Sequence, residues 1–383
     1  MPSGLRAKLR GLSAAASDAP KAKPRGGLLC YAERQDLAEG LMELPAAGLR
    51  RIGWSGRAFD ARRCLFLDTE TTGLSGGAGT VAFLVGVGFV EGDHFTIEQY
   101  LMRDYGDEPE LIDRLANRMD GFDYVCTFNG RTFDMPLLEA RFTMTRMRHR
   151  WREMENLDLL HPARRAWKLR LGSCRLSRLE ELILGCPRTD DLPGSEVPKR
   201  YFEFLKTGDM ALLDDIVRHN RQDVATLSTL LVHLCRIYDR PETLTERRDL
   251  FSIGKALEKQ GELGPARELY RVSAIPSSAG TLAALSGERV AGMANWQLYL
   301  LSRKNRNYEE MRAVLEQMLS RRQMPFEANI ELSKWYEHHA GDCARALEYA
   351  RAAQKHCPPE QAEAVERRVD RLLRKTEKSN LEE

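Results

Sequence analysis

Apolar and polar positions alternate in two different ways along the chain. Between residues 64 and 239, short apolar runs alternate with helical patterns. Strands are predicted at 64–68, 81–90, 95–102 and 123–128. Helices are predicted after Glu108, after Phe133 and from Asp209 to Tyr238. A turn at residues 91–93, Glu-Gly-Asp, joins two of the strands as a hairpin. This order predicts an α/β domain, a mixed sheet flanked by helices.

The pattern changes near Arg240 and is helical from there to the end. Three similar segments, GELGPARELY, RNYEEMRAVL and GDCARALEYA, begin at residues 261, 306 and 341. Each places a turn before a second helix, and spacings of 45 and 35 residues bracket the period of helix-pair repeats. Small residues stand where two helices would cross closely, at Ala256, Ala266, Ala274, Ala346 and Ala350. This part resembles tetratricopeptide repeats, with an ordinary helical bundle as the alternative.

These patterns predict four segments. They are a disordered basic tail at 1–28, a lead-in segment at 29–62, the α/β domain at 63–239 and an all-α helical-repeat domain at 240–383. The tail has six Lys/Arg against the single acid Asp18, and it lacks the apolar core of about 7–15 residues that a secretory signal carries. Its charge and small residues favour disorder, with an organellar presequence as the alternative.

The composition of the 383 residues indicates where the protein is located but not which reaction it catalyses. Charged residues make up 30% and the net charge is +2, as in an ordinary soluble protein. Eight cysteines form no CxxC pair and no Cys/His cluster, which argues against a disulfide framework and against a structural zinc site. We therefore expect a cytoplasmic protein. No stretch approaches the ~18 consecutive apolar residues of a spanning helix, so no membrane partner is expected.

Two acids follow the first predicted strand directly, in CLFLDTETTGLSGGAG at residues 64–79. Strand alternation places Asp68 and Glu70 on the same side. Two carboxylates there repel each other and are costly to desolvate unless a cation lies between them. Oxygen ligands without nearby His or Cys favour magnesium or manganese over zinc. Residues 71–73, Thr-Thr-Gly, bring backbone close to a ligand. The alternative is a solvent-exposed turn.

The glycines near these acids do not predict a nucleotide cradle. GLSGGAGT lacks the Gly-Lys-Ser/Thr ending of a Walker loop, and GVGFVE lacks the third glycine of a dinucleotide fingerprint. Both of these site classes are therefore excluded by the residues themselves.

A further acid occurs in YVCTFNGRTFDMPLLEARF, where a strand runs into a helix that begins near Asp134. A helix N-cap would also explain an aspartate at this position. An N-cap role does not explain why Asp134 follows the end of a second predicted strand, where it could face Asp68 and Glu70. Asp158 lies in the strand-like segment ENLDLL, and it is a candidate only for a supporting role around the metal-binding acids.

The helix predicted from Asp209 carries an acid on an otherwise apolar stripe. Positions on that stripe are Leu212, Ile216, His219, Asp223, Leu227, Leu230 and Leu234. An inward-facing acid needs a partner or a metal. His219 and Asp223 lie one turn apart, so a self-satisfied buried His–Asp pair is the alternative.

Together these three motifs resemble the DEDD exonucleases, which have a ribonuclease H-like fold with a mixed sheet. More narrowly, LDTETTGLSGGAGT, FNGRTFDMPLLEARF and HNRQDV resemble the bacterial YprB-type ribonuclease H-like domain, which can be followed by tetratricopeptide repeats. The resemblance covers about residues 60–236. It implies that Asp68, Glu70, Asp134 and Asp223 bind two Mg²⁺ or Mn²⁺ ions, about 3.5–4 Å apart. It also implies a hydrolase that releases nucleoside 5′-monophosphates.

One departure concerns the catalytic base of this family. Members with a tyrosine base place it four residues before the last Asp, and those with a histidine base usually place it five before. Here His219 stands at the tyrosine spacing, and Arg218 occupies the other position. One helical turn aligns His219 with Asp223, so we expect His219 to remove or relay the proton of the attacking water. It could instead be only a hydrogen-bonding neighbour.

A basic stretch provides candidate contacts to nucleic acid. Between Arg141 and Arg178, eleven Lys/Arg stand against three acids, with Trp151 and Trp167 interleaved. Cations on phosphates and rings on bases hold single strands without reading their sequence. The alternative is a solvated basic face with both tryptophans in the core. A weaker set of substrate contacts is Lys199, Arg200 and Tyr201.

Three functions remain open. The first is a metal-dependent 3′–5′ exonuclease acting on single-stranded DNA or RNA, with repeats that contact a protein partner. A structure-selective endonuclease would use the same acids. A helical-repeat scaffold with an inactive nuclease-like domain is the third, although a dead site has no reason to keep isolated charges on inward faces. No motif here contacts a 2′-hydroxyl, so DNA and RNA are not distinguished.

Overall fold

The chain forms two compact units. The computed structural model describes residues 27–56, 58–73, 79–188, 192–275 and 281–382, so most of the predicted basic tail lies outside the described residues. Of these described residues, the sheet unit comprises those within 27–42, 60–159 and 176–231. The helical unit comprises Glu43–Phe59, Leu160–Arg175 and Val232–Glu383. The boundaries predicted from the pattern, 63–239 and 240–383, stay a prediction.

The sheet unit is built on a mixed six-stranded sheet in the order β1-β4-β3-β2-β5-β6. The strands are β1 (Leu29–Asp36), β2 (Cys64–Thr71), β3 (Ala82–Glu91), β4 (His94–Leu101), β5 (Tyr124–Thr127) and β6 (Glu155–Asp158). The first four strands of this order pair antiparallel, while β5 lies parallel to β2 and β6 parallel to β5. The predicted mixed sheet is confirmed, and β3 and β4 form the predicted hairpin.

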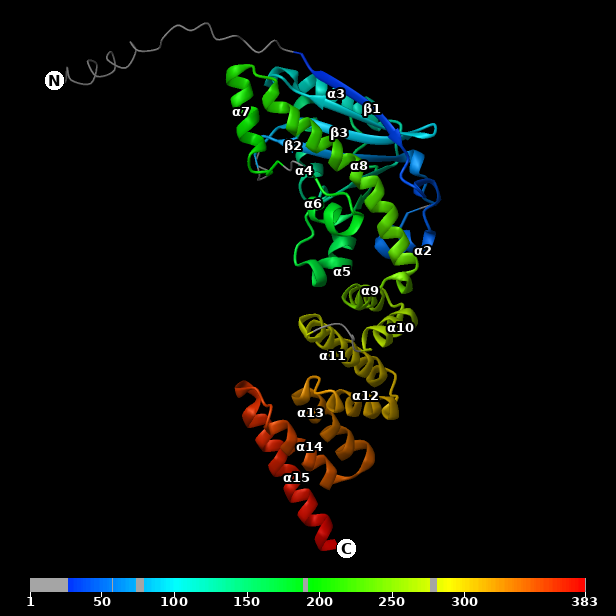
Figure 1. Cartoon of the computed structure of the whole chain (residues 1–383), viewed down its shortest axis with the longest axis vertical. Helices are drawn as coiled ribbons and strands as arrows, with labels where there is room; N and C mark the ends of the chain where they lie inside the picture. Colours follow the sequence, from blue (N-terminus) through cyan, green and yellow to red (C-terminus); the bar gives the residue numbers. More distant parts are fainter. Residues whose placement is uncertain (1–26, 57, 74–78, 189–191, 276–280, 383) are drawn as a thin grey trace, which may run out of the picture. The chain divides into compact units, whose positions relative to one another are not determined.

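Helices flank this sheet. They are α3 (Glu108–Met119), α4 (Asp134–Thr145), α6 (Leu176–Leu179), α7 (Val197–Thr207) and α8 (Ala211–Asp239). Figure 1 shows α8 running across the strands, and hydrogen bonds from α8 to β2 and β4 hold it there. The helices predicted after Glu108 and Phe133 and the long helix from Asp209 are therefore confirmed.

Strand β1 was not among the predicted strands. Its residues lie in the segment interpreted as a lead-in, and most of them are exposed. As an edge strand, β1 pairs with β4 through its backbone and buries little side-chain surface. A strand of this kind lacks the apolar alternation that identifies a half-buried strand.

Two glycines let α8 approach the sheet closely. Gly86 and Gly88 lie on β3, on the face that α8 covers. A Cβ added at Gly86 would lie 2.2 Å from Asn220 Oδ1, and one at Gly88 would lie 2.7 Å from Val224 Cγ1. The glycines of GVGF therefore serve helix–sheet packing rather than a nucleotide.

The helical unit is built from α2 (Ala46–Ile52), α5 (Leu160–Leu171), α9 (Arg247–Lys259), α10 (Leu263–Ser273), α11 (Thr281–Lys304), α12 (Tyr308–Ser320), α13 (Pro325–Trp335), α14 (Cys343–Gln354) and α15 (Ala362–Glu382). From α9 onward, consecutive helices pack against each other, and α5 packs on α9. Ala266, Ala346 and Ala350 are fully buried in these contacts. The all-helical character is confirmed, and the tetratricopeptide assignment stays a prediction. No helix in the described ranges is long and apolar enough to cross a membrane.

Candidate metal centre and active site

Three elements of the sheet unit carry the predicted site residues. Asp68 and Glu70 lie on β2, Asp134 begins α4, and His219 and Asp223 lie on α8. Burial raises the pKa of Asp68 well above its usual range, and the charges of Asp223, Glu70 and Asp134 raise it further. A neighbouring negative charge raises the pKa of a carboxylate in this way only when the two groups lie close together. The fold therefore gathers four carboxylates that are far apart in sequence.

Glu70 and Asp223 are also buried carboxylates with a raised pKa. Burial raises the pKa of Glu70 well above its usual range, with further increases from Asp223 and Asp134. Burial also raises the pKa of Asp223, while His219 and Arg188 lower it. Both side chains are 13% exposed. Such a cluster favours protonation or a cation over four free negative charges.

Asp134 is held by strand β2 rather than by its own helix. Phe133 occupies the N-cap position of α4 and makes no side-chain cap, so the N-cap interpretation of Asp134 is wrong. The Thr69 hydroxyl donates to Asp134 Oδ1. Burial raises the pKa of Asp134 to about 6, although this hydrogen bond lowers it. Because Thr69 alternates away from Asp68 and Glu70, the bond ties Asp134 to the opposite side of the strand.

His219, rather than Arg218, lies beside the last acid. His219 Nε2 is 3.5 Å from Asp223 Oδ2 and 3.9 Å from Glu70 Oε1. Arg218 ion-pairs with Asp215 on the exposed side of the helix. Of the two positions, four and five residues before Asp223, only the first therefore places its side chain, His219, near the acids.

Arg188 was missed by the sequence reasoning and is the cation nearest this cluster. Its Nη2 donates to Asp223 Oδ1, and its Nε donates to Glu180, whose side chain is 1% exposed. Arg188 Nη1 lies 2.9 Å from His219 Nδ1. A guanidinium can only donate, so Nδ1 accepts and the proton of a neutral His219 sits on Nε2, which faces the carboxylates.

The donor chemistry fits a divalent cation, but the present positions do not form a finished ligand set. Within the residues that the structure describes, no three His, Cys, Asp or Glu side chains are arranged to hold an ion. Two contacts account for this. Thr69 ties Asp134 to one side of β2, and Arg188 supplies Asp223 with positive charge. Four carboxylate oxygen donors remain a set that Mg²⁺ or Mn²⁺ accepts.

Asn220 positions Asp68, and it was also missed. Its Nδ2 donates to Asp68 Oδ2 at 2.8 Å, and its Oδ1 accepts from Gln99 Nε2 at 2.8 Å. Asn220 is fully buried at the centre of the α8 stripe, with His219 and Asp223 at the edge. The sequence could have indicated Asn220 only through its position opposite Gly86. Recognising that position requires knowing how α8 lies on β3, and the sequence does not show this.

Other polar residues near the strand ends are satisfied locally. Asp158 accepts from the backbone N–H groups of Asn129 and Arg131, at 2.8 and 3.2 Å, and so fixes the loop that leads to α4. The Thr71 hydroxyl donates to Gly73 O, and the Thr72 hydroxyl accepts from Val81 N. The remainder of the glycine-rich loop, 74–78, lies outside the described residues.

Several predicted nucleic-acid contacts belong to the cores. Trp151 is 2% and Trp167 1% exposed, so the base-stacking interpretation of these rings is wrong and the core alternative holds. Tyr201 is fully buried and stacks on Phe83 with ring centroids 3.8 Å apart. Arg200 ion-pairs with Asp215.

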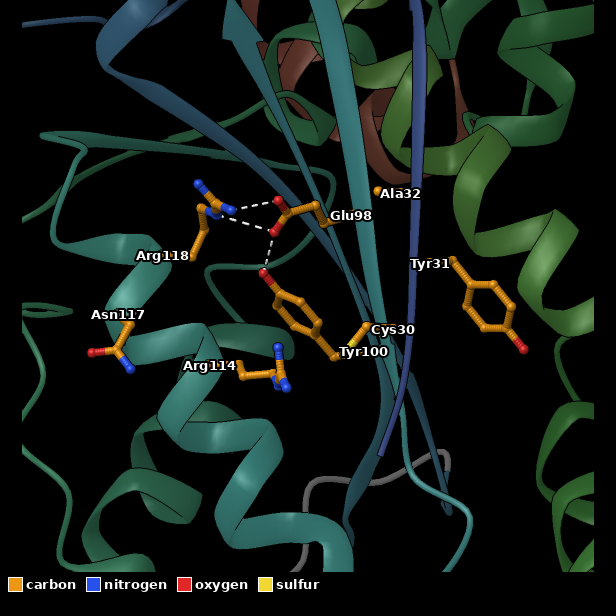
Figure 2. Close-up of a pocket in the computed structure, with 8 residues that line it drawn as sticks. All are labelled: Cys30, Tyr31, Ala32, Glu98, Tyr100, Arg114, Asn117 and Arg118. Carbon is orange, nitrogen blue, oxygen red and sulfur yellow. Dashed lines mark hydrogen bonds and ion pairs between the residues drawn. The ribbon is translucent and has the colours of Figure 1, made fainter. Parts of the chain in front are cut away.

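A separate hollow of about 480 Å³ lies on the opposite face of the sheet from Asp68 and Glu70. Figure 2 shows Arg114 and Arg118 of α3 facing β1 and β4 across this hollow. Its polar groups pair with one another, because Glu98 accepts from both the Arg118 guanidinium and the Tyr100 hydroxyl. The hollow is therefore separate from the candidate active site around Asp68 and Glu70.

Comparison with known proteins gives matches of three kinds. Residues 65–235, which include all the predicted site residues, match a family model described as the RNase_H superfamily. A Bacillus subtilis (strain 168) protein, "Uncharacterized protein YprB", is 33% identical over 330 residues, which cover 84% of this chain and 77% of that protein. A solved family B DNA polymerase from the archaeon Pyrobaculum calidifontis matches 63% of this chain with 15% identity and a TM-score of 0.35. The match spans 30% of the polymerase.

Proposed function

The chain belongs to the family of Bacillus subtilis YprB and carries a domain of the ribonuclease H superfamily, and from this premise we propose that it is a metal-dependent 3′–5′ exonuclease of single-stranded nucleic acid. The superfamily supports hydrolysis of phosphodiester bonds by a nuclease. The direction of hydrolysis, the single-stranded substrate and the two-ion site are the proposed part.

The observation that supports the proposal most is that Asp68 and Glu70 are buried beside the charges of Asp134 and Asp223, which raise the pKa of both. Asp68, Glu70, Asp134 and Asp223 would hold Mg²⁺ or Mn²⁺, since buried carboxylates that repel each other are stabilised by a cation between them. When bound, divalent cations supply Lewis acidity toward water and toward the phosphodiester.

The side chains have separate tasks in this reaction. Asn220 fixes the Asp68 carboxylate through the 2.8 Å hydrogen bond. The water oxygen forms a bond to phosphorus as the P–O3′ bond breaks, and the water proton passes by way of His219 to the departing 3′-oxygen. The products are a nucleoside 5′-monophosphate and a shortened strand with a 3′-hydroxyl. Nδ1 is the basic nitrogen of the neutral His219 ring, and Arg188 now donates to it. His219 therefore acts as a base only after Arg188 releases Nδ1.

The test uses 5′-labelled single-stranded DNA and RNA with Mn²⁺, Mg²⁺ or a chelator. The expected result is a ladder that shortens from the 3′ end with either ion and is absent with chelator. The variant Asp68→Asn keeps an oxygen for Asn220 but loses the charge, so it should abolish the ladder. Asp113→Asn, on the exposed face of α3, is the matched control and should cleave normally.

Two other outcomes have defined meanings. Internal cuts at junctions, without a ladder, would indicate the structure-selective endonuclease. Intact strands with no rise in melting temperature upon adding Mn²⁺ would indicate the inactive scaffold. The specific observation that favours the scaffold is the Arg188 contact with both Asp223 and His219, because an internal cation takes the place of a metal there.

A further inference from the structure

The helical unit contains a pocket of about 600 Å³ between α5, α9 and α11. These three helices are labelled in Figure 1. A cavity of this volume has the size of a small-molecule or single-nucleotide site. None of the acid-cluster residues lines it, so it is a site of its own.

The lining of the pocket is apolar. Leu169 of α5 is 43% exposed, which is unusual for a leucine on a helix that also packs against α9. Phe251 and Ala256 of α9 and Met293 of α11 complete the apolar lining. Phe251 is fixed from behind by Tyr270, with ring centroids 5.7 Å apart. An exposed apolar surface in a preformed hollow is typical of a surface that receives a flat apolar group.

Cations surround this lining on two sides. Arg164 and Lys168 lie one turn apart on α5, and Lys255 and Lys259 lie one turn apart on α9. Across the described chain, Arg164, Lys168 and Lys259 take part in no ion pair.

The pocket also contains little negative charge. Glu258 is the one acid among the residues that line it, and Glu258 already accepts from the Tyr270 hydroxyl at 2.5 Å and from Lys255 at 3.4 Å. Glu258 therefore offsets the charge of Lys255, and no other acid among the lining residues offsets Arg164, Lys168 and Lys259.

We propose that this pocket binds single-stranded nucleic acid, with a base against Leu169 and Met293 and backbone phosphates on Lys168 and Lys259. Paired rows of cations beside an apolar platform are how single strands are held without sequence reading. An acidic amphipathic peptide has a related charge pattern. The choice of nucleic acid rests on the proposed function, which requires the chain to hold a single strand.

The test measures binding without hydrolysis. Labelled single-stranded DNA and RNA are titrated with the full-length protein in chelator, and fluorescence anisotropy gives Kd at several salt concentrations. In Lys168→Gln/Lys259→Gln, loss of two phosphate contacts should weaken binding about tenfold and reduce the salt slope of log K by roughly 1.4. Leu169→Ser should weaken binding about fivefold, because the base then no longer covers the exposed apolar surface of a leucine.

The matched control removes two lysines from the same unit outside the pocket. Lys304 and Lys355 are exposed and lie at the ends of α11 and α14. Lys304→Gln/Lys355→Gln changes the net charge equally, so its Kd should stay within about twofold of the wild type. Unchanged melting temperatures would show that the variants fold.

The outcomes separate this proposal from the exonuclease. Loss of binding in the pocket variants supports the pocket even if the wild type hydrolyses nothing, in which case only the exonuclease proposal fails. Pocket variants that bind like the control overturn the proposal, as does a wild type that binds no strand. If the variants keep strand binding but lose affinity for a labelled glutamate-rich peptide, the pocket is a peptide site and the proposal is wrong.

Discussion

At the scale of single residues, one arginine and four carboxylates determine what the candidate site can bind. Burial and the charges of Asp223 and Asp134 raise the pKa of both Asp68 and Glu70, and Arg188 is a cation that the chain itself supplies. The acids were predictable because each follows a recognisable local pattern. Arg188 and Asn220 were not predictable, because their contacts join residues 35 and 152 positions apart, and no local spacing indicates such a contact.

The stability of the Asp68→Asn variant, measured without metal in the presence of a chelator, should increase relative to that of the wild type as pH rises. The pKa of Asp68 is raised in the folded protein, so the folded state holds a proton that the unfolded chain has released. The stability of the wild type therefore falls as pH rises from about 4 through the folded pKa. The neutral asparagine has no such loss. Urea unfolding at pH 5 and pH 8 should show the larger advantage of Asp68→Asn at pH 8, and a pH-independent difference would contradict the raised pKa.

Arg188→Ala should bind Mn²⁺ more tightly while lowering the stability of the metal-free protein. Without the guanidinium, the acids lose their internal cation, and the buried Glu180 loses its partner. Melting curves with and without Mn²⁺ should show a lower starting temperature and a larger metal-induced rise. Arg218→Ala is the control, since Arg218 is exposed and pairs only near the surface. An equal or smaller rise in Arg188→Ala would show that Arg188 does not compete with metal.

At the scale of elements, close contact between α8 and β3 brings Asp223 and His219 to the acids of β2. The four strands predicted between residues 64 and 128, and the helices α3, α4 and α8, were predictable because apolar periodicity identifies them. The edge strand β1 was missed because it exposes most of its side chains. The apolar stripe of α8 was predicted one residue away from its true centre, since Asn220 rather than His219 points into the sheet.

Gly86→Ala should weaken the site by pushing α8 outward. The new methyl group would lie 2.2 Å from Asn220 Oδ1 and 2.9 Å from Val224 Cγ2, so the helix or strand must shift. Overpacking of this kind costs about 1–3 kcal/mol of unfolding free energy. Chemical denaturation should show that loss, together with a smaller rise in melting temperature on adding Mn²⁺. Gly106→Ala, where an added Cβ meets nothing within 4 Å, is the control. A fully stable Gly86→Ala would contradict the close packing.

At the scale of the whole molecule, two compact units divide the chain in an interleaved way. Residues 43–59 and 160–175 group with the helices after 232. The sequence pattern did not predict α2 and α5 as helices, and an apolar helix face alone does not indicate which core it joins. Arg51 of α2 illustrates this, since its guanidinium donates to Glu262 and to the carbonyl of Tyr238.

Two thermal transitions should accompany the two units. Each unit has its own core, so calorimetry in chelator should resolve two heat-absorption peaks. Mn²⁺ should raise only the transition of the sheet unit, by mass action. Arg51→Ala removes buried hydrogen bonds of the helical unit and should lower only the other transition. A single transition that both changes move would show that the units unfold together.

If the four carboxylates serve hydrolysis of a strand from its 3′ end, the first product identifies that reaction. A 3′-labelled single strand is incubated with the full-length protein and Mn²⁺, and the earliest labelled species is separated by chromatography. We expect labelled nucleoside 5′-monophosphate before any labelled oligonucleotide, and none with Asp68→Asn. Label that appears first in oligonucleotides, or that remains in the full-length strand, would show that the protein is not a 3′–5′ exonuclease.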